Sequence, residues 1–422
     1  MSSLRFVHAA DLHLDAPFRG LSLDSAETGD KLRQATFIAL QNLVDLCLRV
    51  RADFLLVAGD VYNQKDRSLR AQLRFRDALA RLADHNVAAY VVHGNHDPTG
   101  TLSRAVRWPE NTRVFESQEP ECAAYVREEE TLALIHGASH TRGGETRNLA
   151  RKFRRSPEDV FQIGLLHANL GGNTGHEPYA PCDLQDLRAG GMDYWALGHV
   201  HSGGVRSRDP WAVYPGNIQG LSIAEPGSRG CYVVDVGRDR SVEAAFHPLH
   251  AVQWAVLEVD LRDLDTLDRL EEGVLEAVEA ERERAGNCGL ICRVVLCGRG
   301  PLHLRVSEEE GREELVQRLR EQFSAAEPFV WIKDLVAESA PEIDLEARRG
   351  QKDLLGEVLA QAEELRNRED LLEFLHKEVL SDLFGHRRAK RFLQGLSREE
   401  ADELLRRAEL LCADRLESSD GE

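Results

Sequence analysis

The chain has 422 residues, of which 42% are hydrophobic and 30% are charged, and its formal net charge is −19. This length predicts two or three domains, because a single hydrophobic core rarely grows beyond about 250–300 residues. No apolar run reaches the roughly 20 residues that a membrane-spanning helix needs, and the start of the chain lacks the basic and apolar regions of a signal peptide. The eight cysteines form no CxxC pair. The sequence therefore predicts a cytoplasmic protein with reduced thiols and no membrane partner.

Residues 1–250 alternate between strand-like and helix-like segments. Apolar runs at strand length are followed by segments with apolar residues at helical spacing. The expected strands are 4–10, 54–58, 87–92, 131–135, 162–166, 194–197 and 230–236, and the expected helices are 31–50 and 69–83. The opening order of strand and helix predicts a parallel sheet with helices outside, and the later strands predict a second sheet packed on the first.

The rhythm restarts near residue 251 and changes again near residue 341. The middle part predicts a small α+β unit, with strands at 254–259, 290–296, 302–306 and 329–332 and helices at 264–280 and 311–323. After a polar linker at 340–349, residues 354–412 are rich in Leu, Glu, Arg and Ala at helical spacing. We therefore expect domains at 1–250, 251–340 and 341–422.

Side chains that can bind metal ions follow five of the strands in the first domain. They are Asp11 and His13, then Asp60, then Asn95 with His96 and Asp97, then His167, and finally His199 and His201. Ligand sites in open α/β sheets form at the carboxyl ends of strands, so these loops should converge. Each element alone is more often a turn or a structural histidine, but the five together predict a metal centre.

The donor types fit two divalent ions. We expect Asp11, His13 and His201 to hold one ion, and Asn95, His167 and His199 to hold the other. Asp60 would bridge the two ions, because one carboxylate has two oxygens. The D-x-H and H-x-H spacings place both side chains of each pair on one side of an extended segment. Mixed carboxylate, imidazole and amide donors suit Mn²⁺, Fe²⁺ or Zn²⁺, and the absence of thiolates disfavours a structural zinc site.

Such a centre predicts phosphoryl chemistry. Two ions about 3.5–4 Å apart can activate a water molecule for in-line attack on phosphorus. His96 would stabilise the added charge and protonate the leaving alkoxide, and Asp97 would orient the His96 imidazole. Gly59, Gly94 and Gly198 stand at the strand exits, where a positive φ or a close backbone approach is expected.

These motifs resemble the signature of the calcineurin-like metallophosphoesterases over roughly residues 4–220. The opening segment 6–15, the segment 59–63 and the segment 214–217 resemble the bacterial YhaO-type DNA repair exonucleases, which are relatives of the SbcD nuclease subunit. The resemblance implies a four-layer αββα sandwich, a small α+β capping domain and a helical C-terminal region. It also implies Mn²⁺ as the metal, DNA as the substrate, and docking of the C-terminal helices on a coiled-coil ATPase subunit.

Some features depart from that pattern or allow two interpretations. Asn63 stands where some relatives place a histidine, so this position offers a hydrogen-bond donor without charge; Asn63 and His176 are candidates for substrate binding. The basic cluster at 142–155 could follow a phosphate backbone or form a solvated helix face, and the cluster at 386–391 could dock a partner. The acidic net charge lowers the expected affinity for DNA without a partner.

Three functions are therefore weighed. The first is a Mn²⁺-dependent DNA exonuclease that acts in DNA repair. The second is a small-substrate metallophosphoesterase, such as a cyclic-nucleotide phosphodiesterase or a phosphoprotein phosphatase, which has no evident need for residues 251–422. The third is a scaffold without activity, which predicts missing ligands, although every expected ligand is present. DNA versus RNA, the cleavage polarity and a homodimer stay open.

Overall fold

The computed structural model describes residues 4–21, 26–63, 68–100, 106–172, 179–379 and 397–417. The chain divides into two compact units. The first comprises residues 1–257, 274–294 and 313–335, and the second comprises residues 258–273, 295–312 and 336–422. The candidate functional residues of the sequence that the structure describes all belong to the first unit.

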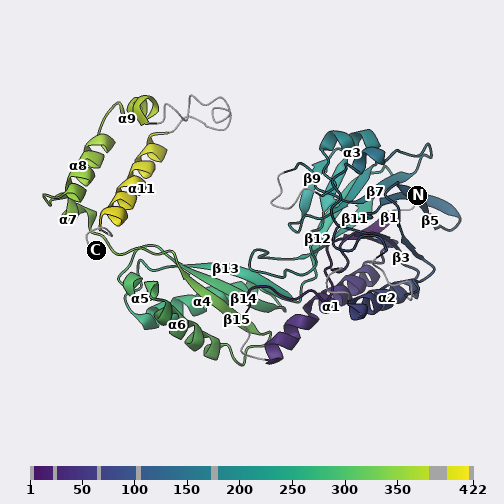
Figure 1. The fold of residues 1–422 in the computed structure, drawn as a ribbon, viewed down its shortest axis with the longest axis horizontal. Coiled ribbons are helices and arrows are strands. Elements are labelled where there is room, and N and C mark those ends of the chain that lie inside the picture. Colours follow the sequence, from purple (N-terminus) through teal and green to yellow (C-terminus); the bar gives the residue numbers. More distant parts are fainter. Residues whose placement is uncertain are drawn as a thin grey trace. The chain divides into compact units, whose positions relative to one another are not determined.

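The first sheet is built around three parallel strands from the start of the chain. Its order is β12-β11-β1-β2-β3-β4 (Figure 1). The strands are β1 at Leu4–Ala9, β2 at Phe54–Ala58, β3 at Ala88–Val92, β4 at Thr112–Val114, β11 at Gly230–Val236 and β12 at Val242–Pro248. Strands β1 to β4 pair in parallel, and β11 joins β1 in the antiparallel sense. The parallel sheet expected from the opening strand and helix order is therefore confirmed.

The second sheet carries the later strands, in the order β5-β6-β7-β8-β10-β9. Its strands are β5 at Glu121–Arg127, β6 at Glu130–Ala138, β7 at Phe161–His167, β8 at Tyr194–Gly198, β9 at Gly204–Arg208 and β10 at Trp211–Tyr214. Strands β6, β7 and β8 pair in parallel. The carboxyl ends of β7 and β8 therefore lie at the same edge of this sheet.

The two sheets pack face to face through aromatic side chains. Phe6 stacks on Phe54 at 5.2 Å between ring centroids and meets Tyr194 of the other sheet edge-on at 5.2 Å. Helices α1 (Ala26–Arg49) and α2 (Leu69–Ala83) cover the outer face of the first sheet. Helix α3 (Leu184–Gly190) and the 3₁₀ turn η1 (Ala150–Lys152) cover the outer face of the second. This is the expected four-layer αββα sandwich.

A third sheet of three strands has the order β13-β14-β15. Its strands are β13 at Val252–Asp260, β14 at Gly289–Cys297 and β15 at Val330–Ala337, and its helices are α4 at Leu267–Ala285, α5 at His303–Ser307 and α6 at Glu309–Gln322. The strand expected at 302–306 is wrong, because these residues form α5. The alternation of apolar and polar residues there is too short to distinguish a strand from one helical turn.

The C-terminal part of the second unit is helical, as expected. Its elements are α7 at Leu345–Arg349, α8 at Leu354–Arg366, α9 at Leu371–Phe374, the π-helical segment η2 at Leu375–Val379 and α11 at Arg398–Glu417. Helix α7 lies inside the expected linker. Buried Glu409 of α11 pairs with Arg349 and Arg366. Among the helices described, none is long and apolar enough to cross a membrane.

Candidate metal centre

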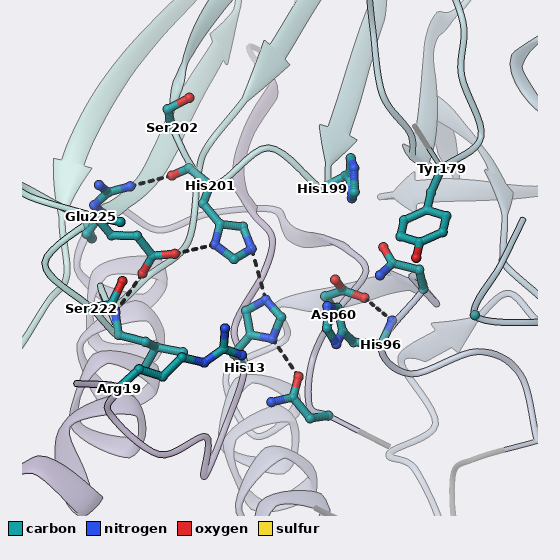
Figure 2. A pocket seen from close by; sticks show the side chains of 16 residues that line it. His13, Arg19, Asp60, His96, Tyr179, His199, His201, Ser202, Ser222 and Glu225 are labelled. Atoms are coloured by element: carbon teal, nitrogen blue, oxygen red, sulfur yellow. Dashed lines mark hydrogen bonds and ion pairs between the residues drawn. The ribbon is translucent and has the colours of Figure 1, made fainter. Parts of the chain in front are cut away.

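The loops after β1, β2, β3, β7 and β8 converge on one cavity of about 900 Å³ (Figure 2). The predicted site residues among its lining are His13, Asp60, Asn63, Asn95, His96, His199 and His201. The first three strands come from one sheet and the last two from the other. The sandwich therefore brings together donors that are distant in the sequence. His13 and His201 are separated by 188 positions, yet their Nε2 atoms lie 3.1 Å from each other.

One group of donors, which we name the His167 cluster, comprises Asp60, Asn95 and His167. His167 donates its Nδ1 hydrogen to the carbonyl of Ala58 at 2.9 Å, so its Nε2 points toward the other two side chains. That nitrogen lies 2.9 Å from Asn95 Oδ1 and 3.3 Å from Asp60 Oδ2. One ring nitrogen and two oxygen atoms thus face one another at close range. Such a set can share a proton on His167, and a metal ion can take the place of that proton.

A second group, which we name the His201 cluster, comprises Asp11, His13 and His201. Their ligand atoms lie within 4.8 Å of one another. His13 Nδ1 donates to Asn63 Oδ1 at 3.0 Å, and His201 Nδ1 donates to Glu225 Oε1 at 2.6 Å. Each ring therefore turns its Nε2 toward the other, and the two atoms are 3.1 Å apart. Such an arrangement is typical of a metal site whose imidazole tautomers are set by outer partners.

The electrostatics of both clusters favour cations. Burial lowers the pKa of His167, but Asp60 and Asp11 outweigh it and raise that pKa to about 9. Burial opposes the ionisation of Asp60, yet His167 and His13 hold its pKa well below the usual range. Burial likewise acts to lower the pKa of His201, while the hydrogen bond to Glu225 acts to raise it. The net result is a pKa above the usual value. The carboxylates thus create a negative potential that holds positive charge at His167 and His201, whereas burial and the neighbouring His201 lower the pKa of His13 to about 3. The same potential suits divalent ions.

Three of the candidate ligand residues occupy strained backbone. Asp11, Asp60 and His199 have φ of 51°, 51° and 102°, in the left-handed region that non-glycine residues rarely adopt. The expected role of the glycines is confirmed at all three positions, since a Cβ on Gly94 would collide with the carboxylate of Asp60. Gly59 has a φ of 88°, and a Cβ there would lie 2.6 Å from His167 Nδ1. A Cβ on Gly198 would collide with the carbonyl oxygen of Ala58.

His96 and Asp97 follow β3 but have different surroundings. His96 is exposed and its ring meets the His13 ring edge-on at 5.1 Å between centroids, while its main-chain N–H binds Asp60 Oδ1 at 2.8 Å. Asp97 is buried, and its carboxylate accepts the main-chain N–H groups of Asp60, Val61 and Gly94 at 3.2, 2.8 and 2.7 Å. Asp97 thus joins the loops after β2 and β3, and its orientation of the His96 imidazole stays a prediction.

Other predicted site residues have mixed outcomes. The His199 ring lies next to His167, at 5.3 Å between centroids, and its main-chain N–H binds the Asp11 carboxylate, so its role as a metal ligand stays a prediction. Asn63 lines the cavity but also fixes the His13 tautomer. His176 and the basic cluster at 386–391 lie outside the described residues.

The basic cluster at 142–155 is paired with acidic neighbours. Arg147 binds Glu145, Arg151 binds Asp186 and Lys152 binds Glu119, at 2.7, 2.7 and 2.6 Å. These pairs neutralise the side chains that the sequence offered as a phosphate track. The structure therefore favours the solvated-surface interpretation of this cluster.

Sequence reasoning missed several residues of the cavity wall, among them Arg19, Tyr179, Glu225 and Arg229. Glu225 binds His201 with Oε1, while Oε2 accepts the Asn217 side-chain amide at 3.0 Å and the Leu221 main-chain N–H at 2.7 Å. Its signal was indirect, because Asn217 belongs to the 214–217 motif. Arg19 and Arg229 follow no motif that the sequence analysis singled out.

Two family models match this chain. Residues 4–203 match the calcineurin-like phosphoesterase model, and residues 254–340 match the model of the middle domain of metallophosphoesterase YhaO. The metallophosphoesterase YhaO of Bacillus subtilis is 33% identical over 422 residues, which is 100% of both chains.

More distant relatives carry another name. The DNA double-strand break repair protein Mre11 of Methanopyrus kandleri is 26% identical over 75% of this chain and 71% of its own length. The protein of that name from Aeropyrum pernix is 24% identical over 66% of this chain and 70% of its own length. Among solved structures, a dimetal phosphatase from Danio rerio aligns with 57% of this chain and 98% of its own, at 14% identity and a TM-score of 0.35.

Proposed function

The chain belongs to the calcineurin-like phosphoesterases, in the YhaO family, and from that premise we propose that it is a two-metal phosphodiesterase that cleaves DNA with Mn²⁺. The family consists of metal-dependent hydrolases. The choice of DNA is supported by the relatives named for double-strand break repair. The exonuclease activity and the role in DNA repair that the sequence analysis expects are part of this proposal.

The observation that carries the proposal is the close approach of candidate ligand atoms in both clusters. His13 Nε2 and His201 Nε2 lie 3.1 Å apart, and His167 Nε2 lies 2.9 Å from Asn95 Oδ1. Each imidazole is fixed through Nδ1 by an acceptor, which leaves Nε2 for a ligand. The donor set of nitrogen and oxygen without thiolate supports Mn²⁺ or a similar borderline ion.

The chain's own residues can then be given roles. Two bound divalent ions would supply an activated water molecule and neutralise charge on the phosphoryl oxygens. Asp60, whose pKa the nearby histidines hold down, stays ionised and faces both clusters. His96 is exposed at the cavity, so its imidazole can donate a proton to the leaving alkoxide of the DNA strand. The buried carboxylate of Asp97 keeps the loops that carry Asp60 and His96 in register.

The test is cleavage of DNA labelled at either end, with and without added Mn²⁺. We expect cleavage that depends on Mn²⁺ and is abolished by a chelator. His96→Ala should lower the cleavage rate about 10²–10⁴-fold, because a positioned general acid contributes that much, while the bound metal stays unchanged. His85→Ala is the matched control, since His85 is exposed at the end of α2 and does not line the cavity.

The outcome also separates the alternative function. If the protein hydrolyses bis(4-nitrophenyl) phosphate with Mn²⁺ but leaves every DNA substrate intact, it is a small-substrate phosphoesterase. If His96→Ala cleaves DNA as fast as the wild type, His96 is not the proton donor. Parallel reactions with RNA of the same sequence decide between the two nucleic acids.

We also propose that the C-terminal helices dock on a coiled-coil ATPase subunit. Leu354 of α8 and Leu411 of α11 are 64% and 58% exposed, which supports an apolar contact surface. Leu411→Glu should weaken co-purification with such a subunit and leave the DNA cleavage of the isolated chain unchanged. Undiminished co-purification would contradict this assignment.

A further inference from the structure

Arg19 reaches the cavity without a partner of its own. Its side chain is exposed, lines the cavity and extends toward His13 (Figure 2). Within the described part of the chain, its guanidinium makes no hydrogen bond or ion pair. Other arginines of the first unit are paired with acidic groups, such as Arg147 with Glu145 and Arg151 with Asp186. An unpaired guanidinium beside a metal centre therefore calls for a ligand.

The other arginine of the cavity wall has a different task. Arg229 donates to the carbonyl of His201 at 2.6 Å, to Asn217 Oδ1 at 3.2 Å and to the carbonyl of Pro226 at 3.0 Å. These bonds use both terminal nitrogens to hold the loop after β10. Arg229 is thus committed to structure, and Arg19 is the cavity cation that is left to meet an anion among the residues described.

The loop that carries Arg19 is fastened from two sides. The main-chain N–H of Arg19 donates to the carbonyl of Leu221 at 2.9 Å, and the neighbouring Phe18 stacks on Trp254 at 5.8 Å between centroids. Trp254 is fully buried in β13 and donates Nε1–H to the carbonyl of Gly220 at 3.0 Å. The backbone at Arg19 is therefore held at a fixed place, which lowers the entropy cost of binding an anion there.

We propose that Arg19 forms a second phosphate subsite, beside the His201 cluster, that binds a phosphate adjacent to the scissile one. This inference rests on the proposed function and names its substrate class as a nucleic-acid strand. A small ester with one phosphate has no group that reaches such a subsite. The scissile phosphate would lie at the metal ligands, and the next phosphate along the strand would meet the planar guanidinium, which suits phosphate oxygens.

The subsite also offsets the repulsion between DNA and a protein of acidic net charge. A DNA strand approaching this protein meets a long-range field that repels it. Local contacts must then supply the attraction, and a guanidinium at the mouth of the metal centre acts where the strand is closest. The metal ions would hold the scissile phosphate and Arg19 would hold its neighbour. Together they would fix the position of the strand for cleavage.

The test compares Arg19→Gln and Arg19→Lys with the wild type on two substrates. We expect Arg19→Gln to raise KM for DNA about tenfold, as for loss of one charged hydrogen bond, with little change in kcat. Hydrolysis of bis(4-nitrophenyl) phosphate, which has a single phosphate, should be unchanged. Arg19→Lys should restore part of the loss. Arg238→Gln, at an exposed site in the turn after β11, is the control of equal charge change.

Methylphosphonate substitution locates the contact. Oligonucleotides with one neutral methylphosphonate at each position are compared, and we expect one position next to the scissile bond to weaken binding by the wild type. The same oligonucleotide should make no difference to Arg19→Gln. Binding is followed by fluorescence anisotropy in the His96→Ala background. Adding Arg19→Gln to this background should reduce the slope of log affinity against log salt concentration by about the amount that one phosphate contact contributes.

The outcomes separate this inference from the proposed function. If the wild type neither cleaves nor binds DNA, both fail together. If the wild type cleaves DNA and Arg19→Gln does so with the same KM, the second subsite alone is wrong. If Arg19→Gln slows bis(4-nitrophenyl) phosphate and DNA by the same factor, Arg19 contacts the scissile phosphate and the proposal is overturned.

Discussion

The two halves of the candidate metal centre are held in different ways. In the His167 cluster, the imidazole is fixed by the main-chain carbonyl of Ala58, and both His167 and Asp60 are buried. In the His201 cluster, the imidazoles are fixed by the side chains of Asn63 and Glu225, and the His201 side chain is 21% exposed. Backbone partners come with the fold, whereas side-chain partners can be replaced one at a time.

This difference teaches which half of the site can be tuned by substitution. The His167 cluster should change only when a ligand itself is changed. The His201 cluster should respond to its outer partners and to the Arg19 loop. The following predictions test that contrast, starting with the largest expected effect.

Asp60→Asn should damage both halves together. The ligand atoms of Asp60 lie within 4.8 Å of those of His167 and of Asp11, which belong to different clusters, and the ionised carboxylate of Asp60 favours positive charge at His167 and His201. Loss of that charge should lower DNA cleavage at least about a hundredfold, as for removal of one key electrostatic group. Elemental analysis should find fewer than two ions per chain. Asp159→Asn, an exposed carboxylate elsewhere, should keep full activity, and two tightly bound ions in Asp60→Asn would contradict the bridging role.

Glu225→Gln should weaken only the His201 half. The carboxylate lies 2.6 Å from His201 Nδ1 and strengthens that imidazole as a ligand. Outer partners of this kind contribute about 10–100-fold to metal affinity. Calorimetric titration with Mn²⁺ should therefore show one weakened and one unchanged binding event. An equal loss of Mn²⁺ affinity in both events would contradict the proposed difference between the two clusters. Glu243→Gln, at an exposed position, serves as the control.

Asn63→Ala should have a smaller effect on the same half. The amide oxygen holds the His13 tautomer at 3.0 Å but carries no charge. We expect a loss of about tenfold, at the lower end for an outer partner, in the affinity for the ion that Glu225→Gln also weakens. The same titration measures it. A change in the other binding event instead would show that Asn63 does not act on the His201 cluster.

Trp254→Phe should give the smallest effect and leave both ions in place. The substitution keeps the ring against Phe18 but removes the hydrogen bond from Nε1 to the Gly220 carbonyl. A lost hydrogen bond costs about 1 kcal/mol of unfolding free energy, which urea denaturation can measure. We expect a rise of less than about tenfold in KM for DNA. A change in Mn²⁺ affinity would show that β13 supports the metal ligands as well as the Arg19 loop.

Much of the fold could be predicted from local patterns. Apolar runs at strand length placed β1, β2 and β3 within one residue of their ends, and helix α2 was expected at its observed bounds. The short segment at 302–306 was assigned wrongly, because one turn of helix and a short strand share the same alternation. Helix α7 was missed inside a segment whose polar composition indicated a linker.

For the candidate site, the sequence by itself determined which loops carry donors and that they meet, because the carboxyl ends of parallel strands share one edge of a sheet. Only the tertiary structure decided which ring nitrogen faces the centre, since that depends on Ala58, Asn63 and Glu225. It alone placed Arg19 beside His13 and fastened its loop to Trp254. Strand order follows from periodic local patterns, whereas contacts between residues hundreds of positions apart arise from packing and leave no periodic trace in the sequence.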